Sequence, residues 1–410
     1  MANDKNETET LKSVKEEYIT EVIEKEFGKN AKVKKIEEVL TSGAGENYAS
    51  DLHRIQVDVE LEDKTETTVS YIYKAMPNSE FGGQMLKAMN IFPREIEIYT
   101  KIIPKFEELY KEAGKTVRFS PKCVFVAPGE EAFLMEDLKP KKFVNAKRQI
   151  GLNIDQVKRT LEKLAEYHAA SVIVYERDGY AATYIEGIFK EEIMKPMLEM
   201  QKSLMNIYID CLKQNENVQP YIHKMLKMLD YGFDKFLDAM KVNENEFNVL
   251  NHGDLWCNNI MFQYDDNDNI TETYFVDYAA AKYGSPSQDL WYFLLSSCEK
   301  SIKIDKFEYF VKFYHDKLIE NLKLLQYTKE LPKLLDLQIQ LLKNSLWAFS
   351  TVQGLLPIIL VDPTELATMD NFMDTGDAGM KFKIMSFSNP RYLDALEELL
   401  PWLDNKGIMD

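Results

Sequence analysis

The stretch from residue 247 to residue 293 constrains the fold more than any other part of the chain. An apolar run at residues 247–250 ends in a polar turn, and a second apolar run follows at residues 260–262. This succession of apolar and polar segments predicts a strand, a loop and a second strand. The loop between the two strands would present Asp254 and Asn259 in one place.

A third apolar run, at residues 273–276, leads directly into Asp277. The chain thus carries an aspartate, an asparagine five residues later and a second aspartate after a predicted hairpin. Phosphoryl transfer needs such a set, because one carboxylate orients the attacking hydroxyl while an amide and a second carboxylate hold Mg²⁺. The spacing suggests a kinase with Asp254, Asn259 and Asp277 as catalytic residues, of which Asn259 and Asp277 are the metal ligands.

Each of these residues also has an ordinary structural interpretation. A single Asp or Asn in a loop is usually a turn former, and a lone histidine such as His252 is more often a buried structural residue than a catalyst. We therefore assign His252 a role in fixing the loop. A metal site with His252 and Asp254 as ligands is disfavoured, because no further His or Cys lies at ligand spacing nearby.

The motif His-Gly-Asp-x-x-x-x-Asn at residues 252–259, followed by Asp277, resembles the catalytic loop and metal aspartate of the aminoglycoside phosphotransferase and choline kinase group. The longer run at residues 252–262, with its tryptophan and its pair of asparagines, resembles more narrowly the ecdysteroid kinase-like family. The segment Gly-Ser-Pro-x-x-Asp-Leu-Trp at residues 284–291 fits the same family.

This resemblance implies an α+β, protein kinase-like fold of two lobes. Residues 1–137 would form an N-lobe with a small five-stranded antiparallel sheet, a glycine turn and a nucleotide lysine. Residues 138–410 would form a larger, mostly helical C-lobe with the catalytic loop, the metal aspartate and the acceptor pocket. In this family the aspartate at the position of Asp289 braces the catalytic loop and does not touch the substrate.

Alternating apolar residues predict three sequential strands at residues 33–40, 55–61 and 69–74. Between the first two lies a turn with Gly43 and Gly45, where backbone amides could approach phosphate oxygens closely. With only two glycines, the turn taken alone could equally be an ordinary hairpin turn. Its position before two strands and a strand-borne lysine favours nucleotide binding.

Lys74 ends the third predicted strand, a placement that matches the lysine with which kinases neutralise phosphate charge. The ordinary alternative is an exposed lysine at a strand end. The family would place a glutamate on the next helix to hold this lysine, and the sequence offers Glu95 and Glu97. Only Glu95 shares a helical face with the apolar residues of that helix, so we predict a Lys74–Glu95 pair and a solvated Glu97.

Two more apolar runs, at residues 123–126 and 132–135, predict the last strands of this lobe. The segment that follows lies where kinases have the hinge whose backbone hydrogen-bonds the adenine. Backbone contacts leave little trace in a sequence. We therefore assign Glu136 and Leu138 to nucleotide binding by position alone.

The chain carries 67 acidic and 50 basic residues, a net charge of −17, which argues against nucleic acid or an anionic membrane as its main partner. Its polar start predicts no secretory signal, and no apolar run is long enough to predict a membrane span. The four cysteines are scattered and predict reduced thiols. We expect a cytoplasmic monomer.

The resemblance implies an ATP- and Mg²⁺-dependent kinase for a small molecule, with a hydroxyl of an ecdysteroid or of a hydroxylated xenobiotic as the acceptor, and detoxification as one role. A kinase fold that only binds a hydrophobic ligand is the alternative, left open by the reduced glycine turn and by Tyr278, where many relatives have Phe. A protein kinase is disfavoured, because only a short segment separates Asp277 from Asp289 and no Ala-Pro-Glu motif is present.

Overall fold

The computed structural model describes residues 14–40, 51–76, 86–129, 131–188, 204–367, 371, 374 and 376–410. The predicted glycine turn with Gly43 and Gly45 lies outside these residues, so its role stays a prediction. Within the described part of the chain, no helix combines the length and the apolar character that a bilayer crossing requires.

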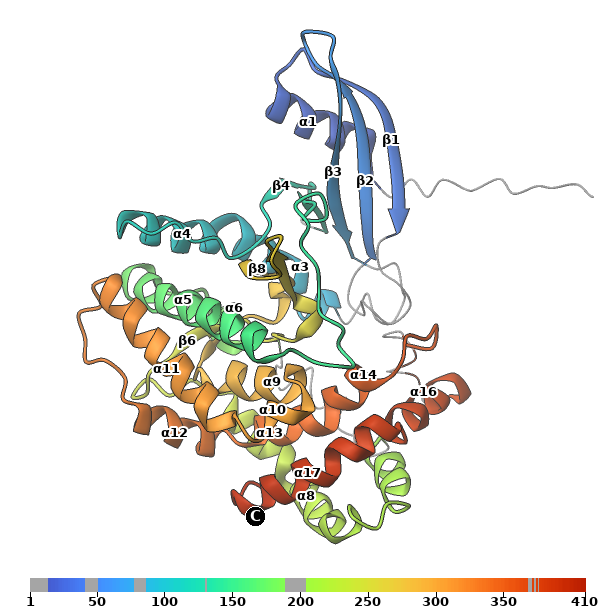
Figure 1. Ribbon diagram of the computed structural model, residues 1–410, viewed down its shortest axis with the longest axis vertical. Helices are drawn as coiled ribbons and strands as arrows, with labels where there is room; N and C mark the ends of the chain where they lie inside the picture. Colours follow the sequence, from blue (N-terminus) through green and yellow to red (C-terminus); the bar gives the residue numbers. More distant parts are fainter. Residues whose placement is uncertain are drawn as a thin grey trace, which may run out of the picture.

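Five strands form one antiparallel sheet at one end of the molecule (Figure 1). Helix α1 (Glu16–Phe27) packs on one face of this sheet, where Ile55, Val57 and Val59 alternate along one strand and are fully buried. The alternation in the sequence therefore marks the inner face. The spatial order of the strands is β1 (Lys32–Leu40), β2 (Asp51–Glu60), β3 (Glu66–Ala75), β5 (Ala132–Glu136) and β4 (Cys123–Val126).

The other face of the sheet packs against helix α3 (Ile91–Glu97). Phe92 of α3 meets Phe133 of β5 edge to face, with ring centroids 6.2 Å apart. A π-helical turn (Ile98–Ile102) and helix α4 (Ile103–Glu112) continue from α3. Because neighbours along a strand point to opposite faces, Lys74 lies on the α3 side of the sheet while Tyr73 packs into the core on the α1 side.

Most of the remaining chain is helical. Helix α5 (Ile154–Asp178) begins at a capping box in which the Asn153 side chain accepts from Gln156 N and the Gln156 side chain accepts from Asn153 N, both at 3.0 Å. Further helices among the described residues include α6 (Ala182–Glu186), α8 (Gln219–Ala239), α9 (Ser287–Ser297), α10 (Lys300–Lys303), α11 (Phe307–Leu324), α12 (Leu334–Lys343), α13 (Leu346–Ser350), α14 (Leu356–Leu360), α16 (Asp377–Phe387) and α17 (Pro390–Asn405), with a π-helical turn at Thr351–Leu355.

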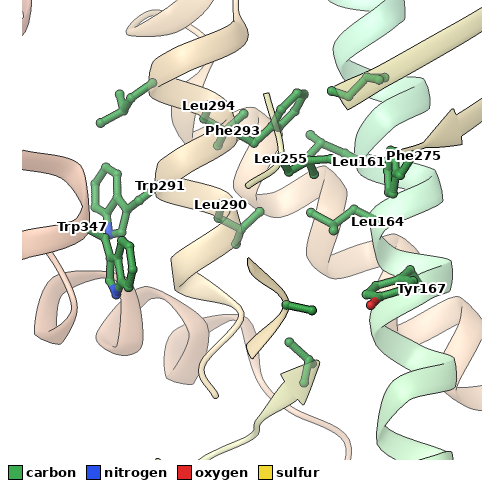
Figure 2. Packing of buried hydrophobic residues seen from close by; sticks show 14 of the residues in the cluster. Leu161, Leu164, Tyr167, Leu255, Phe275, Leu290, Trp291, Phe293, Leu294 and Trp347 are labelled. Carbon is green, nitrogen blue, oxygen red and sulfur yellow. The ribbon is translucent and has the colours of Figure 1, made fainter. Parts of the chain in front are cut away.

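Helix α9 lies at the centre of the helical lobe. Figure 2 shows Leu161 and Leu164 of α5 pointing toward Leu290 on one side of α9, while Trp291 points from another side toward Trp347. Ten of the eleven residues of α9 are buried. A helix that is buried nearly all round lies in the core, and the first turn of α9 reaches the catalytic loop from there.

Two short strand pairs frame the catalytic loop. Strand β6 (Val249–Asn251) pairs with β9 (Lys282–Gly284), and β7 (Ile260–Tyr264) pairs with β8 (Ile270–Phe275), all antiparallel. The predicted strand, loop and hairpin are therefore present. The predicted two-lobed α+β arrangement, a small antiparallel sheet beside a larger helical part, is confirmed, whereas the boundary between residues 137 and 138 stays a proposal.

Candidate active site

Lys74 lies between two carboxylates that come from different parts of the chain. Its Nζ donates to both side-chain oxygens of Glu95 at 2.8 Å and to Oδ1 of Asp277 at 3.0 Å. Lys74 is 4% exposed and Glu95 is fully buried, which excludes the alternative of an exposed lysine at a strand end. Burial lowers the pKa of Lys74, but the charges of Asp277 and Glu95 outweigh that effect and hold the pKa above its usual value.

Glu97 was predicted to be solvated, and the structure corrects this in part. Its carboxylate accepts a 3.0 Å hydrogen bond from the hydroxyl of Tyr184 and lies 3.5 Å from Lys101 Nζ. It is half-buried, and its partners are Tyr184 and Lys101, whereas Lys74 pairs with Glu95. Glu95 is therefore the one glutamate of α3 that meets the strand-borne lysine.

The loop between β6 and β7 brings Asp254 and Asn259 into contact. Asn259 Nδ2 donates to Asp254 Oδ2 at 2.9 Å and to the Asp254 backbone carbonyl at 2.8 Å. The Tyr292 hydroxyl, from α9, donates to the other carboxylate oxygen, Oδ1, at 2.5 Å. Both oxygens of Asp254 are therefore held by donors, and the orientation of this carboxylate is fixed.

Burial raises the pKa of the Asp254 carboxyl to about 7, and the nearby charge of Asp277 acts in the same direction. The hydrogen bonds from Tyr292 and Asn259 favour the ionised form and oppose that rise. A carboxylate with a pKa near neutrality suits a group that accepts a proton during a reaction.

The backbone of the loop requires glycine at position 253. Gly253 has φ +84°, and a Cβ atom built there would lie 2.1 Å from the carbonyl oxygen of Ala280. Asp289 then holds the loop from behind, because its carboxylate accepts the backbone N–H groups of His252 at 2.7 Å and Gly253 at 2.9 Å. These contacts support the bracing role of Asp289, which stays a prediction.

Both ring nitrogens of His252 form hydrogen bonds with the backbone. Nε2 donates to the carbonyl of Val276 at 3.1 Å, and Nδ1 accepts from the backbone N–H of Asp254 at 3.3 Å. Burial lowers the pKa of His252, so the neutral ring that these two bonds require is favoured. Within the described residues no group of three or more His, Cys, Asp or Glu side chains could hold a metal. The geometry supports a loop-fixing role.

Asp277 sits in an unusual backbone conformation, with φ 65° and ψ 65°. Its N–H donates to the hydroxyl of Tyr99, from the turn that follows α3, at 3.1 Å. Non-glycine residues adopt this left-handed region at a cost and often do so at functional sites. The conformation directs the Asp277 carboxylate toward Lys74.

Asn259 and Asp277 fit the predicted magnesium site. The backbone N–H of Val276 donates to the carbonyl of Asn259 at 3.0 Å and ties the two segments together. The side-chain amide of Asn259 donates to Asp254, and Oδ1 of Asp277 accepts from Lys74. Within the described residues, the side-chain oxygen of Asn259 and Oδ2 of Asp277 accept no hydrogen bond. Amide and carboxylate oxygens are the ligands that Mg²⁺ prefers.

Glu136 and Leu138 lie at the end of β5 and in the turn after it. The Glu136 carboxylate pairs with Lys141 and lies 3.5 Å from Arg118, so it points away from Lys74 and its partners. Leu138 packs against Phe143 and Tyr274, and its backbone N–H donates no hydrogen bond within the described residues. A contact to the adenine through this N–H stays a prediction.

Sequence reasoning missed Tyr292 and the contact between His168 and Asp289. His168, on α5, is fully buried, and its Nε2 lies 3.2 Å from Oδ2 of Asp289. Tyr292 is three residues after Asp289 on the same helix, one turn further along. That spacing was the available signal, because residues at i and i+3 share a helix face and Asp289 was already assigned to the loop.

A sheet lobe that supplies a buried Lys–Glu pair, joined to a helical lobe with an Asp, Asn and Asp set, defines a kinase-like protein. A model of the ecdysteroid kinase-like family matches residues 44–327, and the chain belongs to this family.

Two individual proteins are similar to this chain. A 4-hydroxytryptamine kinase of Psilocybe cyanescens is 38% identical over 71 residues, which are 16% of this chain and 20% of that protein. The match thus spans about a fifth of the relative's length. Among solved structures, an ethanolamine kinase of Plasmodium vivax aligns with a TM-score of 0.36 and 14% identity over 83% of this chain and 82% of that one.

Proposed function

We propose that the protein transfers the γ-phosphoryl group of ATP to a hydroxyl of a small molecule. The observation that carries this proposal is the convergence of Lys74, Glu95 and Asp277 from three separate elements, with Asp254 and Asn259 on the adjoining loop. Phosphoryl transfer depends mainly on positioning and on electrostatic stabilisation, and this set supplies both.

Each residue has a distinct part in the reaction. Asp254 orients the acceptor hydroxyl and accepts its proton while the new oxygen–phosphorus bond forms and the bond to the departing ADP breaks. Lys74 neutralises phosphate charge, and Glu95 keeps its ammonium in place. Asn259 and Asp277 would hold Mg²⁺, which supplies positive charge against the phosphate oxygens when bound. Glu136, Leu138, Gly43 and Gly45 complete the proposed nucleotide site.

For the acceptor we propose an ecdysteroid or a hydroxylated xenobiotic. Membership of the ecdysteroid kinase-like family supports this class, and the short match to a protein named as a kinase of 4-hydroxytryptamine agrees with a hydroxylated small molecule. A detoxification role, a monomeric state and a cytoplasmic location belong to the same proposal.

Calorimetric titration of the protein with ATP, with and without Mg²⁺, tests the proposal. We expect saturable binding that needs Mg²⁺ and is lost in Asp277→Ala, because that variant removes a metal ligand and a partner of Lys74. Asp266→Ala is the matched control, since Asp266 is an exposed aspartate at the tip of the β7–β8 hairpin and should leave binding unchanged.

Binding in the wild type would justify a screen of hydroxylated steroids and xenobiotics for phosphate gain by mass spectrometry. Equal binding by Asp277→Ala would reject the assignment of the metal site. No binding of ATP under any metal condition would reject the kinase and favour a binding protein for a hydrophobic ligand.

A further inference from the structure

A cavity of about 490 Å³ lies beside β9, the strand that pairs with β6 just ahead of the catalytic loop. Its walls come from the second half of α8 with residues 240–248, from residues 282–288, from residues 342–347 where α12 ends and α13 begins, and from residues 407–410. None of the proposed nucleotide or catalytic residues lines it. We call it the Lys282 cavity. Its size suits a small molecule rather than a single water.

The acidic residues in the wall of the Lys282 cavity are already paired with lysines. Lys241 Nζ lies 2.6 Å from Asp238, and Lys343 Nζ lies 2.6 Å from Glu246. Asp410 lies 3.5 Å from Lys224. These contacts cancel most of the negative charge around the cavity, so it does not repel an anion.

Lys282 differs from Lys241 and Lys343 at the rim because no carboxylate of the described residues pairs with it. It is 3% exposed, and its Nζ donates to the backbone carbonyls of Ile185 at 3.1 Å and Tyr283 at 3.0 Å. An ammonium has three N–H donors, so one of them has no acceptor among the described residues. Burial lowers the pKa of Lys282 to about 8, and the nearby charge of Arg94 acts in the same direction.

A second buried cation adds to this positive charge. Arg94 is 1% exposed, and its guanidinium donates to the backbone carbonyls of Thr183 and of Ala281, the residue next to Lys282. Its Nε has no hydrogen-bond partner, and no carboxylate of the described residues pairs with it. Two buried cations without a counter-charge are costly, and a bound anion would reduce that cost.

The remaining wall of the cavity is polar and favours the same kind of ligand. Ser285, Ser287, Gln288 and Asn344 contribute hydroxyl and amide groups. Ser287 and Gln288 also form the first turn of α9, an eleven-residue helix whose N-terminal end carries partial positive charge. The helix end is a minor contribution, since its N–H groups already have partners.

We propose that the Lys282 cavity binds a small molecule that carries a phosphate or carboxylate group, with the Lys282 ammonium as its counter-ion. Such a ligand would also affect the active site through a chain of hydrogen bonds. Asn251, whose side chain donates to the carbonyls of Lys282 and Gly284, accepts the N–H of Asp289, which braces the catalytic loop. The cavity is thus a candidate regulatory site for a kinase, although its binding is independent of the nucleotide site.

Thermal unfolding of the full chain in sodium phosphate, sodium acetate or sodium chloride at matched ionic strength tests this inference. A ligand that binds only the folded protein should raise the unfolding temperature by about 2 °C at ten times its dissociation constant. We expect phosphate or acetate, but not chloride, to produce this rise in the wild type. The anion that gives the larger rise in unfolding temperature identifies the preferred group, phosphate or carboxylate.

Variants separate this cavity from other sites. The rise should be lost in Lys282→Gln and in Lys282→Met, and it should persist in Lys323→Gln, which removes an exposed lysine of α11 that does not line the cavity. It should also persist in Lys74→Met, because the nucleotide site is not involved. A rise that survives both Lys282 variants, one that disappears in Lys74→Met, or no rise in the wild type would each overturn the proposal.

If neither Lys282 variant folds, the wild type, Lys323→Gln and Lys74→Met still decide between the two sites. Lys282→Arg, which keeps the charge, should retain the anion effect and gives a further check. Titration calorimetry with sodium phosphate on the same proteins should then give one binding site per chain. If the heat of phosphate binding disappears in Lys74→Met, the phosphate binds at the nucleotide site instead.

Discussion

The carboxylate of Asp254 is held at both oxygens, and one of the two donors is a residue that no motif marks. Tyr292 donates to Oδ1 and Asn259 donates to Oδ2. A carboxylate that accepts a proton from one direction works best when its orientation is fixed. The rate of the reaction falls steeply when the base is misplaced. Tyr292 therefore acts on the reaction through Asp254.

Replacing Tyr292 with Phe removes this hydroxyl and keeps the ring. A hydrogen bond to a charged group is worth about 1.5–3 kcal/mol, which corresponds to a loss of about 10- to 100-fold in kcat. ATP affinity should stay unchanged, since Tyr292 does not contact Lys74 or Asp277. Steady-state kinetics with an acceptor from the screen measures kcat and KM separately.

Tyr309→Phe is the matched control for this change, because Tyr309 is a 46% exposed tyrosine on α11. It should leave both kinetic constants as in the wild type. If Tyr292→Phe kept full kcat, the hydroxyl of Tyr292 would have no part in positioning Asp254.

At the scale of the element, the catalytic loop depends on one glycine. Gly253 and Gly114 both have positive φ, +84° and +79°, but only at Gly253 would a Cβ meet another backbone atom, at 2.1 Å from Ala280 O. Gly114→Ala should cost about 1 kcal/mol of the free energy of unfolding, from backbone strain alone. Gly253→Ala should cost more than about 3 kcal/mol, because the clash must move the loop or the 3₁₀ turn Tyr278–Ala280 that contains Ala280.

Urea unfolding of the two variants measures this difference. Gly114→Ala is the control, since nothing lies within 4 Å of its added Cβ. Equal losses of stability in the two variants would show that the loop can accommodate a side chain, and that the close approach to Ala280 does not constrain it.

The elements of the loop were predictable because each is encoded locally. Apolar runs gave β6, β7 and β8, and a helical face distinguished Glu95 from Glu97. The sequence places the start of α9 less accurately. Ser285, followed by Pro286 and Gln288, is the pattern of a helix N-cap with a capping box. The helix begins at Ser287 instead, and Ser285 Oγ accepts from Ser287 N at 3.3 Å. The Ser285 hydroxyl also contacts Gln340 of α12, a tertiary contact that local pattern cannot reveal.

Contacts between distant segments account for most of what the sequence did not reveal. Tyr292 reaches Asp254 across 38 positions, and Arg94 reaches Ala281 across 187. No periodicity or spacing encodes such approaches, because they depend on how helices and strands pack. The ordered residues of the motif were recognisable without packing, whereas the Lys282 cavity exists only after four separate segments have come together.

At the scale of the whole molecule, Asp289 joins the catalytic loop to two long helices. Its carboxylate accepts the N–H groups of the loop and the Nε2–H of His168 on α5, while the Nδ1 of His168 accepts from the hydroxyl of Tyr314 on α11 at 2.7 Å. This arrangement requires a neutral His168. Burial lowers the pKa of His168 below its usual 6.5, which favours that neutral form.

The sign of the resulting pH dependence follows from linkage. Below pH 6.5 the unfolded chain protonates His168 and the folded protein does not, so this residue contributes stability above pH 6.5 that is lost as the pH falls. The loss approaches about 1.4 kcal/mol per pH unit for one histidine. Asp254 contributes with the opposite sign, because its pKa is raised to about 7 in the folded protein.

Comparing the wild type with His168→Gln cancels the contribution of Asp254 and isolates that of His168. His168→Gln should destabilise the protein at pH 7.5, and the difference in the free energy of unfolding should shrink by up to about 1.4 kcal/mol per unit as the pH falls from 6.5 to 5. Tyr314→Phe is the control, because it breaks the same contact but keeps the buried histidine. A difference that is constant with pH for His168→Gln would mean that the pKa of His168 is the same in the folded and unfolded protein. A difference that grows as the pH falls from 7.5 to 6.5 would mean that the folded protein protonates His168, and the network through Asp289 would then be an ion pair.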